Sequence, residues 1–318
     1  MPSTLTVTQS ATIKAIVNLF ETGEVLGDYG QVTLIAGDTG HLTFGRSQTT
    51  LGSGNLDLLL QEYCGNAGAR FGRRLTEALP QAKAKDTALD GDLKLHNVLR
   101  ASADDPVMRD VQDTFFDKTY FDPAMKTAEG ARIFTPLGKA VVYDSRVHGA
   151  WKLVRDRVDG TPETVGEREW IHRYVEARRS WLATHSRPDL RKTVYRMDAF
   201  NRLIELDAWG LDLPLVVRGA EISPLTLAGL PPGTYVGPQP GTSELSFLTS
   251  QSLTRGLDVR LLQLALSERG ADIRADGVFG RASATCVASH QQAVGLPVTG
   301  VADPALVLSL ASEVTTIN

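Results

Sequence analysis

The stretch NLFETGEVLGDYGQVTLIAGDTGHLTFG, residues 18–45, places one carboxylate before, and one inside, the predicted start of a small sheet. Apolar residues at positions 13, 16, 17 and 20 repeat at helical spacing, which predicts an amphipathic helix over residues 10–22 with Thr8 or Ser10 as its cap. Glu21 lies in the last turn of that helix. Two β-prone runs then flank a Gly-Asp-Thr-Gly segment, residues 37–40, which predicts a hairpin-like turn around Asp38.

Length and composition are those of an ordinary soluble protein. At 318 residues the chain has room for one large and one small domain, and 42% apolar with 22% charged residues is typical of folded chains. The net charge of -4 gives no basic excess for a nucleic-acid partner, and no apolar run reaches the about 18 residues that span a membrane. The N-terminus carries no recognisable secretion signal. We therefore expect neither nucleic-acid binding nor membrane insertion, and export by lysis or a dedicated secretion system unless a signal has been removed.

Helical patterns define the domain organisation. They dominate in residues 55–64, 105–121, 131–149, 168–185 and 194–210. The first domain, residues 1–222, is therefore predicted to be mainly α with a small β-hairpin or sheet near its start. Residues 223–251 carry five prolines among Gly, Thr and Ser, which predicts a semi-rigid linker. Residues 252–318 are predicted to form a compact helical domain.

The final domain resembles the type-1 peptidoglycan-binding domain, a small three-helix module. Two segments carry the resemblance, VRLLQLALSERG at residues 259–270 and DGVFGRASATCVASHQQAVGLPVTGVAD at residues 276–303. The matching residues are Leu262, Gln263, Leu266, Gly270, Asp276, Gly277, Phe279, Gly280, Gln291 or Gln292, Gly295, Leu296, Thr299, Gly300, Val301 and Asp303. The resemblance implies a shallow groove for a wall stem peptide or glycan. The alternative is that these residues only build the fold.

The first domain resembles the inverting chitosanase family of the lysozyme-like superfamily. The resemblance extends over about residues 8–222. It is carried by Glu21, by GDTGHLTFG (37–45), LGSGNLDLLLQEY (51–63) and TYFDPAMKTAEGARIFTPLGKAVVYDSRVHG (119–149), and by two closing segments at residues 175–181 and 195–215. It implies a lysozyme-like α+β fold and the hydrolysis of a glycosidic bond by two carboxylates.

The resemblance assigns roles to three residues of the opening stretch. Glu21 would be the general acid, and partial burial against apolar neighbours would raise its pKa. Asp38 would be the general base, and Thr43 would help to position the attacking water. The carboxyl groups of an inverting pair lie roughly 6.5–9.5 Å apart, and the product has the inverted anomeric configuration. Taken singly, Glu21 fits a solvated surface acid and Asp38 fits a turn residue bonded to its own backbone. Glu24 is the rival acid if the helix continues.

Five further residues are candidates for the site. The resemblance places Asp144, Arg178 and Arg196 in a buried network behind the cleft that orients the acid, although an ordinary ion pair between two helices would use the same residue types. His41 and Arg46, beside the predicted turn, are candidate substrate contacts. For His41 an exposed turn histidine is the alternative.

One departure from the family pattern bears on the substrate. Where chitosanases of this family carry an aspartate that grips the cationic amine of glucosamine, this chain has Asn55. The missing charge removes a charge-assisted hydrogen bond worth about 1.5–3 kcal/mol, and an amide suits a neutral acetamido or hydroxyl group. Asn55 is alternatively the N-cap of the helix that follows it.

Other chemistries have little support. The six histidines show no HExxH motif or clustered ligand spacing, so we expect no metal and no other cofactor. Cys64 and Cys286 are far apart in the sequence, so we expect no disulfide framework, and Cys64 has no recognisable His partner for nucleophilic catalysis. No helical seam for pairing is predicted, so we expect a monomer.

The sequence leads to three hypotheses. The first is a peptidoglycan hydrolase, a metal-independent lysozyme-like β-1,4-glycosidase of N-acetylmuramidase type that acts on the bacterial cell wall, outside the cell or in the periplasm, as an endolysin or effector. The second keeps the reaction and makes chitosan, a related aminosugar polymer, the substrate. The third is a non-catalytic cell-wall-binding protein whose lysozyme-like domain is a scaffold.

Overall fold

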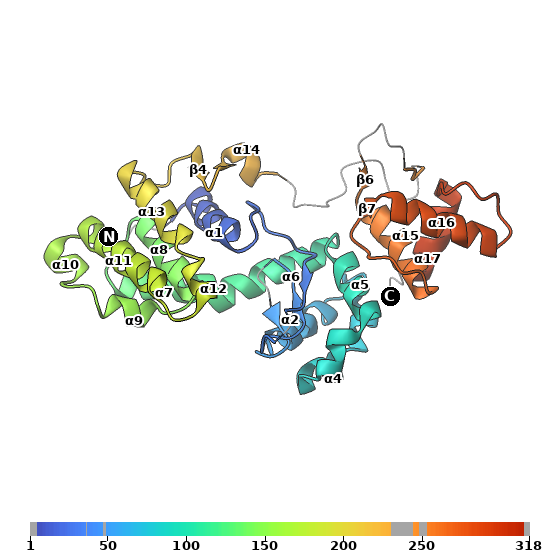
Figure 1. Cartoon of the computed structure of the whole chain (residues 1–318), viewed down its shortest axis with the longest axis horizontal. Coiled ribbons are helices and arrows are strands. Elements are labelled where there is room, and N and C mark those ends of the chain that lie inside the picture. The colour runs from blue at the N-terminus through green and yellow to red at the C-terminus, as the bar shows by residue number, and fades with distance from the viewer. Residues whose placement is uncertain (1–4, 36, 47–48, 230–243, 248–252, 315–318) are drawn as a thin grey trace. The chain divides into compact units, whose positions relative to one another are not determined.

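The structure is a computed structural model that describes residues 5–35, 37–46, 49–229, 244–247 and 253–314 (Figure 1). The chain divides into two compact units. The first unit comprises residues 1–27 and 115–229, and the second comprises residues 28–114 and 230–318. The predicted first domain therefore contributes to both units. Most of the predicted linker, residues 223–251, lies outside the described residues, but its beginning forms a short helix, α14, Pro224–Leu227.

The first unit begins with α1, Val7–Glu21, which starts three residues earlier than predicted. Thr6 is its cap: its Oγ1 accepts a hydrogen bond of 3.1 Å from the backbone N of Gln9, while the Gln9 side chain accepts one of 3.0 Å from the backbone N of Thr6. This reciprocal capping box satisfies two free backbone donors. The prediction of Thr8 or Ser10 as the cap was wrong, because both lie inside the helix.

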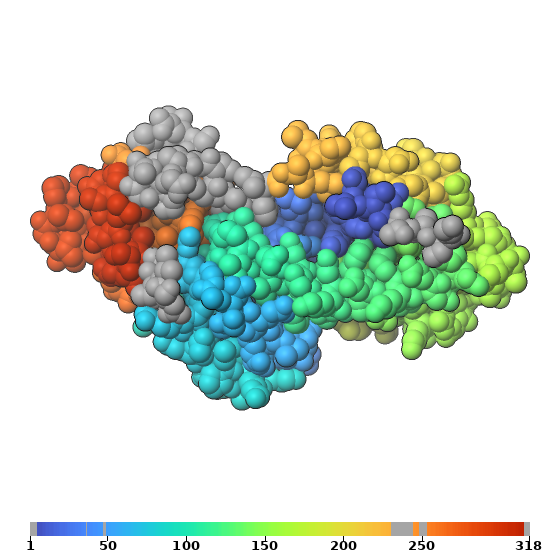
Figure 2. Space-filling view, turned by 180° about the vertical axis from the view of Figure 1, so that it is seen from behind, coloured from blue at the N-terminus to red at the C-terminus, as the bar shows by residue number. Residues whose placement is uncertain are grey.

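Helices make up most of the first unit. Helix α8 packs on α1 and α7, while α11 packs on α8, α9 and α13. The dark-blue surface of α1 lies between the gold surface of residues 215–227 and the green surface of the helices that follow residue 115 (Figure 2). The remaining elements are η2 Asp117–Phe121, a π-helical turn, α7 Asp122–Gly130, α8 Pro136–Val147, α9 Trp151–Arg155, α10 Pro162–Val165, α11 Glu167–Ala183, α12 Pro188–Arg191, α13 Tyr195–Glu205, and the antiparallel strands β4 Leu215–Val217 and β5 Ala220–Ile222.

The second unit begins with a three-stranded antiparallel sheet of order β1-β2-β3. Its strands are β1 Val32–Thr33, β2 Thr43–Phe44 and β3 Thr49–Thr50, with Val32 opposite Phe44 and Thr43 opposite Thr50. The segment between β1 and β2 contains residues 37–40, as the hairpin-like prediction requires. The third strand was not predicted.

Short helices follow the sheet. They are α2 Asn55–Cys64, α3 Gly72–Thr76, α4 Leu79–Ala84, the 3-10 helix η1 Thr87–Gly91 and α5 Leu93–Ser102. Helix α6, Pro106–Phe116, then leads the chain into the first unit.

The C-terminal part of the second unit contains the three predicted helices and one small antiparallel sheet. Its elements are β6 Thr254–Arg255, α15 Leu257–Glu268, β7 Val278–Phe279, α16 Arg281–Ala293 and α17 Pro304–Val314. Gln263 holds the loop before β7: its amide nitrogen donates to Asp276 Oδ1 at 2.9 Å, and its oxygen accepts from the backbone N of Gly277 at 2.9 Å. Gln291, rather than its neighbour, is the buried motif glutamine, and it donates to the carbonyl oxygen of Val301 at 2.8 Å. These motif residues fix loops within the fold.

The predicted fold class, mainly α with small sheets and an added C-terminal helical domain, is confirmed. No helix among the described residues has the length and apolar character needed to cross a membrane.

Candidate active site

Glu21 is the last residue of α1, and the end of the helix sets its position. Both the backbone N and the hydroxyl of Thr22 bond back to the carbonyl oxygen of Asn18, at 2.8 and 2.9 Å. Gly23 follows with a φ of +79°, which glycine adopts readily, so the chain turns away there. The Glu21 side chain is 32% exposed, and its Oε1 accepts a hydrogen bond of 2.7 Å from Arg196 Nη2. Its partner is thus a guanidinium of the predicted network.

Glu24, the rival acid, is exposed and lies beyond the end of the helix. Its backbone N donates a hydrogen bond of 3.3 Å to the Thr22 hydroxyl, and no hydrogen bond to its carboxylate is found in the described part of the chain. Because no partner holds its carboxylate, the structure favours Glu21 over Glu24.

Arg196 and Asp144 form a buried ion pair behind Glu21. Arg196, on α13, is 3% exposed, and its Nη1 donates to Oδ1 of the fully buried Asp144, on α8, at 2.7 Å. One guanidinium therefore bridges two carboxylates. Burial alone lowers the pKa of Arg196, but the Asp144 and Glu21 carboxylates outweigh it and hold that pKa above its usual range. The predicted association of Glu21, Arg196 and Asp144 is present in the structure.

Arg178 lies beside this network and contacts His148, and among the residues that the structure describes it makes no hydrogen bond to Asp144 itself. Its Nη2 lies 3.1 Å from Nδ1 of His148, and its Nη1 donates to the carbonyl oxygen of Gly149 at 2.8 Å. Because a guanidinium only donates, Nδ1 of His148 must accept, which requires the neutral ring. Burial, together with the Arg196 charge, lowers the pKa of His148 to about 4. No motif in the sequence marks His148, although its position four residues after Asp144 places it one helical turn away.

Asp38 lies in the segment between β1 and β2, and its side chain is exposed. Its backbone N donates to the carbonyl oxygen of Ile35 at 3.0 Å, and no hydrogen bond to its carboxylate occurs within the described residues. A Cβ at Gly40 would lie 2.9 Å from Asp38 Oδ2. The close approach of Gly40 therefore lets the carboxylate fold back over the turn and leaves its oxygens open to water.

Thr43 and His41 flank the same turn. Thr43, in β2, is buried, and its hydroxyl donates to the carbonyl oxygen of His41 at 3.0 Å, which leaves its oxygen lone pairs free to accept from a water. His41 Nδ1 lies 2.9 Å from Asp90 Oδ2, while Asp90 Oδ1 accepts from the backbone N of Leu42 at 2.8 Å. Asp90 thus anchors the base of the turn. No local sequence signal links it to His41, because 49 positions separate the two residues.

Arg46 is placed inside the second unit. It is 7% exposed, its Nη1 forms an ion pair with Asp113, and the same atom donates to the Tyr29 hydroxyl at 3.2 Å. The Tyr29 hydroxyl also bonds to Asp113 at 2.8 Å, and burial raises the pKa of Tyr29 to about 12. Burial and these bonds make Arg46 a structural anchor of the sheet rather than the substrate contact that the sequence analysis expected.

Asn55 is the first residue of α2, and Gly54 is its N-cap, so the prediction of Asn55 as the cap was wrong by one position. Its side chain is half-buried. Two residues on, Asp57 is buried and accepts from the Gln61 amide at 2.7 Å. Asp57 is thus engaged within its own helix and does not replace the carboxylate that position 55 lacks.

Glu21, Arg196 and Asp144 belong to the first unit, whereas Asp38 and Thr43 belong to the second. Within the described ranges, no group of three or more His, Cys, Asp or Glu side chains could hold a metal ion. What the chain offers is a helix-end carboxylate held by a buried guanidinium, and a turn carboxylate open to water.

Comparisons with known proteins identify the families that the two parts of the chain match. The model of glycosyl hydrolase family 46 matches residues 15–215, and the model of a peptidoglycan binding domain matches residues 255–310. A chitosanase of Bacillus subtilis (strain 168) is 27% identical in an alignment of 233 residues that covers 67% of this chain and 83% of that protein.

Two solved structures share the fold. A chitosanase from Bacillus subtilis MY002, complexed with 6 GlcN, has a TM-score of 0.59 at 23% identity and covers 68% of this chain and 96% of its own. A chitosanase of Gynuella sunshinyii, in complex with chitotetraose, has a TM-score of 0.55 at 24% identity and covers 69% of this chain and 98% of its own. Because the family model matches well over half of the residues, the chain belongs to glycosyl hydrolase family 46 and is a glycoside hydrolase, with a peptidoglycan-binding domain at its C-terminal end.

Proposed function

We propose that this protein hydrolyses the β-1,4 bonds of an aminosugar polymer with inversion, using Glu21 as general acid and Asp38 as general base. Glu21 gives its proton to the glycosidic oxygen as the bond from C1 to that oxygen breaks. Asp38 takes a proton from the water that attacks C1 from the opposite face. Glu21 ends the step ionised and Asp38 protonated, and proton exchange with solvent restores both.

The observation that carries the proposal is the bridge from Glu21 through Arg196 to Asp144. A general acid must be held in one place, and it becomes an anion when it has given up its proton. Arg196 meets both requirements. Its Nη2 donates a hydrogen bond of 2.7 Å to Oε1 of Glu21, which holds the carboxyl group in place, and its charge stabilises the carboxylate that the reaction leaves. The fully buried Asp144 in turn fixes Arg196.

Asp38 and Thr43 supply the other half of the reaction. The Asp38 carboxylate is open to water, as a base that activates a water molecule requires. The Thr43 hydroxyl has its hydrogen committed to the carbonyl oxygen of His41, so its oxygen can accept a hydrogen bond from that water. In the substrate complex we expect the Glu21 and Asp38 carboxyl groups to lie roughly 6.5–9.5 Å apart.

Chitosan is the first candidate substrate. The matched relative is a chitosanase, and the two related structures are chitosanases in complex with 6 GlcN and with chitotetraose. These relatives support the chitosan hypothesis better than the N-acetylmuramidase hypothesis that the sequence analysis put first.

Peptidoglycan is the second candidate, and two observations favour it. Residues 255–310 match a peptidoglycan-binding domain, which would raise the local concentration of wall glycan at the catalytic residues. By the family resemblance, Asn55 takes the place of a carboxylate that binds a glucosamine amine, and an amide accepts an N-acetylated sugar.

Release of reducing ends from chitosan and from purified peptidoglycan by the full chain tests both candidates. We expect activity on chitosan, and Glu21→Gln should lower kcat by about 10²–10⁴-fold on whichever polymer is cut. Glu24→Gln is the matched control and should retain wild-type activity. Equal activity of wild type and Glu21→Gln would refute the assignment of the acid, and no activity on either polymer would support the scaffold hypothesis.

A further inference from the structure

The second unit holds its C-terminal helices against α5 by buried polar contacts. Helix α15 packs on α5, and Arg260 of α15 is 5% exposed. Its Nε donates to Oδ2 of the equally buried Asp104 at 2.7 Å, and its Nη1 donates to the carbonyl oxygens of Arg100 and Ala275 at 2.9 and 3.0 Å. A second arginine, Arg109, bonds to the other oxygen of Asp104 at 2.7 Å. The charges of this contact are therefore paired, as a lasting interface requires.

A second set of bonds fixes the loop that follows α15. The Asn97 side chain, on α5, donates to the carbonyl oxygen of Ile273 at 3.1 Å and accepts from the backbone N of Ala275 at 3.1 Å. Gly277 has a φ of +77°, and a Cβ there would lie 2.9 Å from Arg260 Nε. Glycine at position 277 thus permits Arg260 to reach Asp104.

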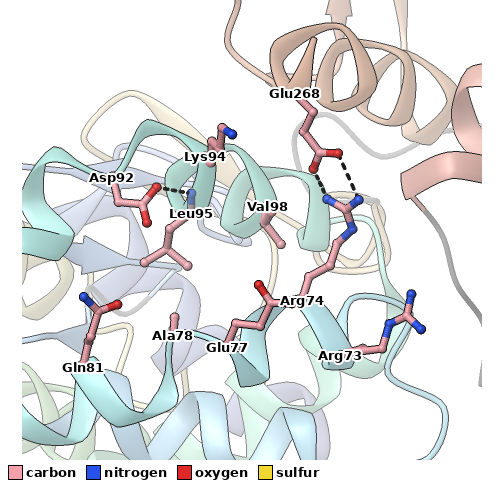
Figure 3. A pocket seen from close by; sticks show the side chains of 10 residues that line it. All are labelled: Arg73, Arg74, Glu77, Ala78, Gln81, Asp92, Lys94, Leu95, Val98 and Glu268. Carbon is pink, nitrogen blue, oxygen red and sulfur yellow. Dashed lines mark hydrogen bonds and ion pairs between the residues drawn. The ribbon is translucent and has the colours of Figure 1, made fainter. Parts of the chain in front are cut away.

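This docking completes a cavity of about 490 Å³ between α3, α4, α5 and the end of α15 (Figure 3). Glu268 of α15 supplies one wall, where both of its carboxylate oxygens meet the guanidinium of Arg74, at 3.0 Å for Oε2 and Nη2. Ala78, Leu95 and Val98 provide a buried apolar lining. The cavity therefore needs residues from both ends of the second unit.

The positive and negative residues around this cavity are equal in number. Among the described residues, the side chains of Arg73, Glu77 and Lys94 make no hydrogen bond or ion pair, although the Glu77 charge acts on Arg74 and opposes the lowering of its pKa by burial. By contrast, Arg74 and Glu268 bind each other. A cavity with an apolar lining and with cations and a carboxylate available at its edge suits a small ligand that carries both charges.

We propose that this cavity is an accessory binding site for a short zwitterionic peptide, of the kind that peptidoglycan carries as its stem. The free amine of the peptide pairs with Glu77, its carboxylates pair with Lys94 and Arg73, and its aliphatic side chains cover the apolar lining. The site lies outside the glycosidase residues, so it does not depend on which glycan is cleaved.

Isothermal titration calorimetry of the full chain with a synthetic stem tetrapeptide that carries no sugar tests the proposal. Wild type should bind the peptide, and Lys94→Gln or Glu77→Gln should each weaken the Kd about tenfold or more, because each removes one charge-assisted bond. Lys83→Gln is the matched control, since Lys83 is an exposed lysine of α4 that does not line the cavity. A peptide with acetylated and amidated ends should bind wild type about as weakly as the free peptide binds Lys94→Gln or Glu77→Gln.

Two results would overturn the proposal: no binding of the free tetrapeptide to wild type, or an unchanged Kd in both Lys94→Gln and Glu77→Gln. The second result would assign binding to another surface of the chain. Arg74→Met, which opens the wall at Glu268, should also weaken binding if the cavity is the site. Hydrolysis of chitosan by all of these variants should equal that of wild type, so failure here leaves the proposed catalytic function untouched.

Discussion

Replacement of Arg196 by methionine separates the stabilising and the catalytic parts of the Glu21 network. In Arg196→Met, Asp144 remains fully buried and loses the one hydrogen bond found for its carboxylate in the described residues. Removal of one partner from a buried ion pair costs about 3–5 kcal/mol, so we expect the free energy of unfolding to fall by that amount. Glu21 loses a charge-assisted hydrogen bond of about 1.5–3 kcal/mol, which predicts a ten- to hundredfold lower kcat with little change in KM.

Urea unfolding followed by tryptophan fluorescence measures the first effect in the relevant unit, because all four tryptophans, Trp151, Trp170, Trp181 and Trp209, lie within residues 115–229. Initial rates on a soluble oligomer of the cleaved polymer measure the second. Arg179→Met is the matched control: Arg179 of α11 pairs with Asp198 of α13, the helix that also carries Arg196, but both side chains are more than 40% exposed. Its stability and activity should stay close to wild type.

The double variant Arg196→Met/Asp144→Asn distinguishes the two effects. Without a buried charge, it should recover part of the lost unfolding free energy, while kcat stays low because Glu21 is still unanchored. An unfolding free energy within about 1 kcal/mol of wild type, together with unchanged kcat in Arg196→Met, would refute the reasoning.

Three further changes test neighbouring parts of the site. Gly40→Ala places a methyl group 2.9 Å from Asp38 Oδ2, so it should displace the carboxylate and lower kcat, with an unchanged circular dichroism spectrum and melting temperature. Asn55→Asp restores a carboxylate and should lower KM for chitosan about tenfold or more without helping on peptidoglycan; an unchanged ratio of the two KM values would count against a role for position 55. The pKa of His148 is about 4 in the folded chain and 6.5 in a free histidine, so the unfolded chain binds more protons between these values. The stability that neutral His148 contributes is complete above about pH 6.5 and is lost toward pH 4. For this partly exposed ring the loss is about 2 kcal/mol of the free energy of unfolding. His148→Gln should flatten the dependence of that free energy on pH, measured by urea titrations at several pH values.

Local sequence rules predicted the helix that carries Glu21, because the apolar spacing of α1 and the turn that follows are local properties. They missed the start of the helix, since Thr6 and Gln9 cap one another reciprocally and an apolar pattern does not detect such a pair. They also missed β3, because a two-residue strand of Thr49 and Thr50 carries no periodicity.

Contacts between distant segments could not be predicted from local patterns. The role of Arg46 as a buried partner of Tyr29 and Asp113 depends on packing that no spacing in the sequence encodes. The same holds for the contact of Arg260 with Asp104, 156 positions apart, which ties the C-terminal helices to α5. The family resemblance supplied what local rules could not, namely the association of Glu21, Arg196 and Asp144.

The anomeric configuration of the first product tests the central claim most directly. Proton NMR of a soluble β-1,4-linked oligomer, recorded within the first minutes of hydrolysis by the full chain and before mutarotation, reports the new reducing end. Two carboxylates that act as acid and base on opposite faces of the sugar predict that the α-anomer appears first and later equilibrates. An initial excess of the β-anomer would mean two successive displacements at C1 and would contradict the roles assigned to Glu21 and Asp38.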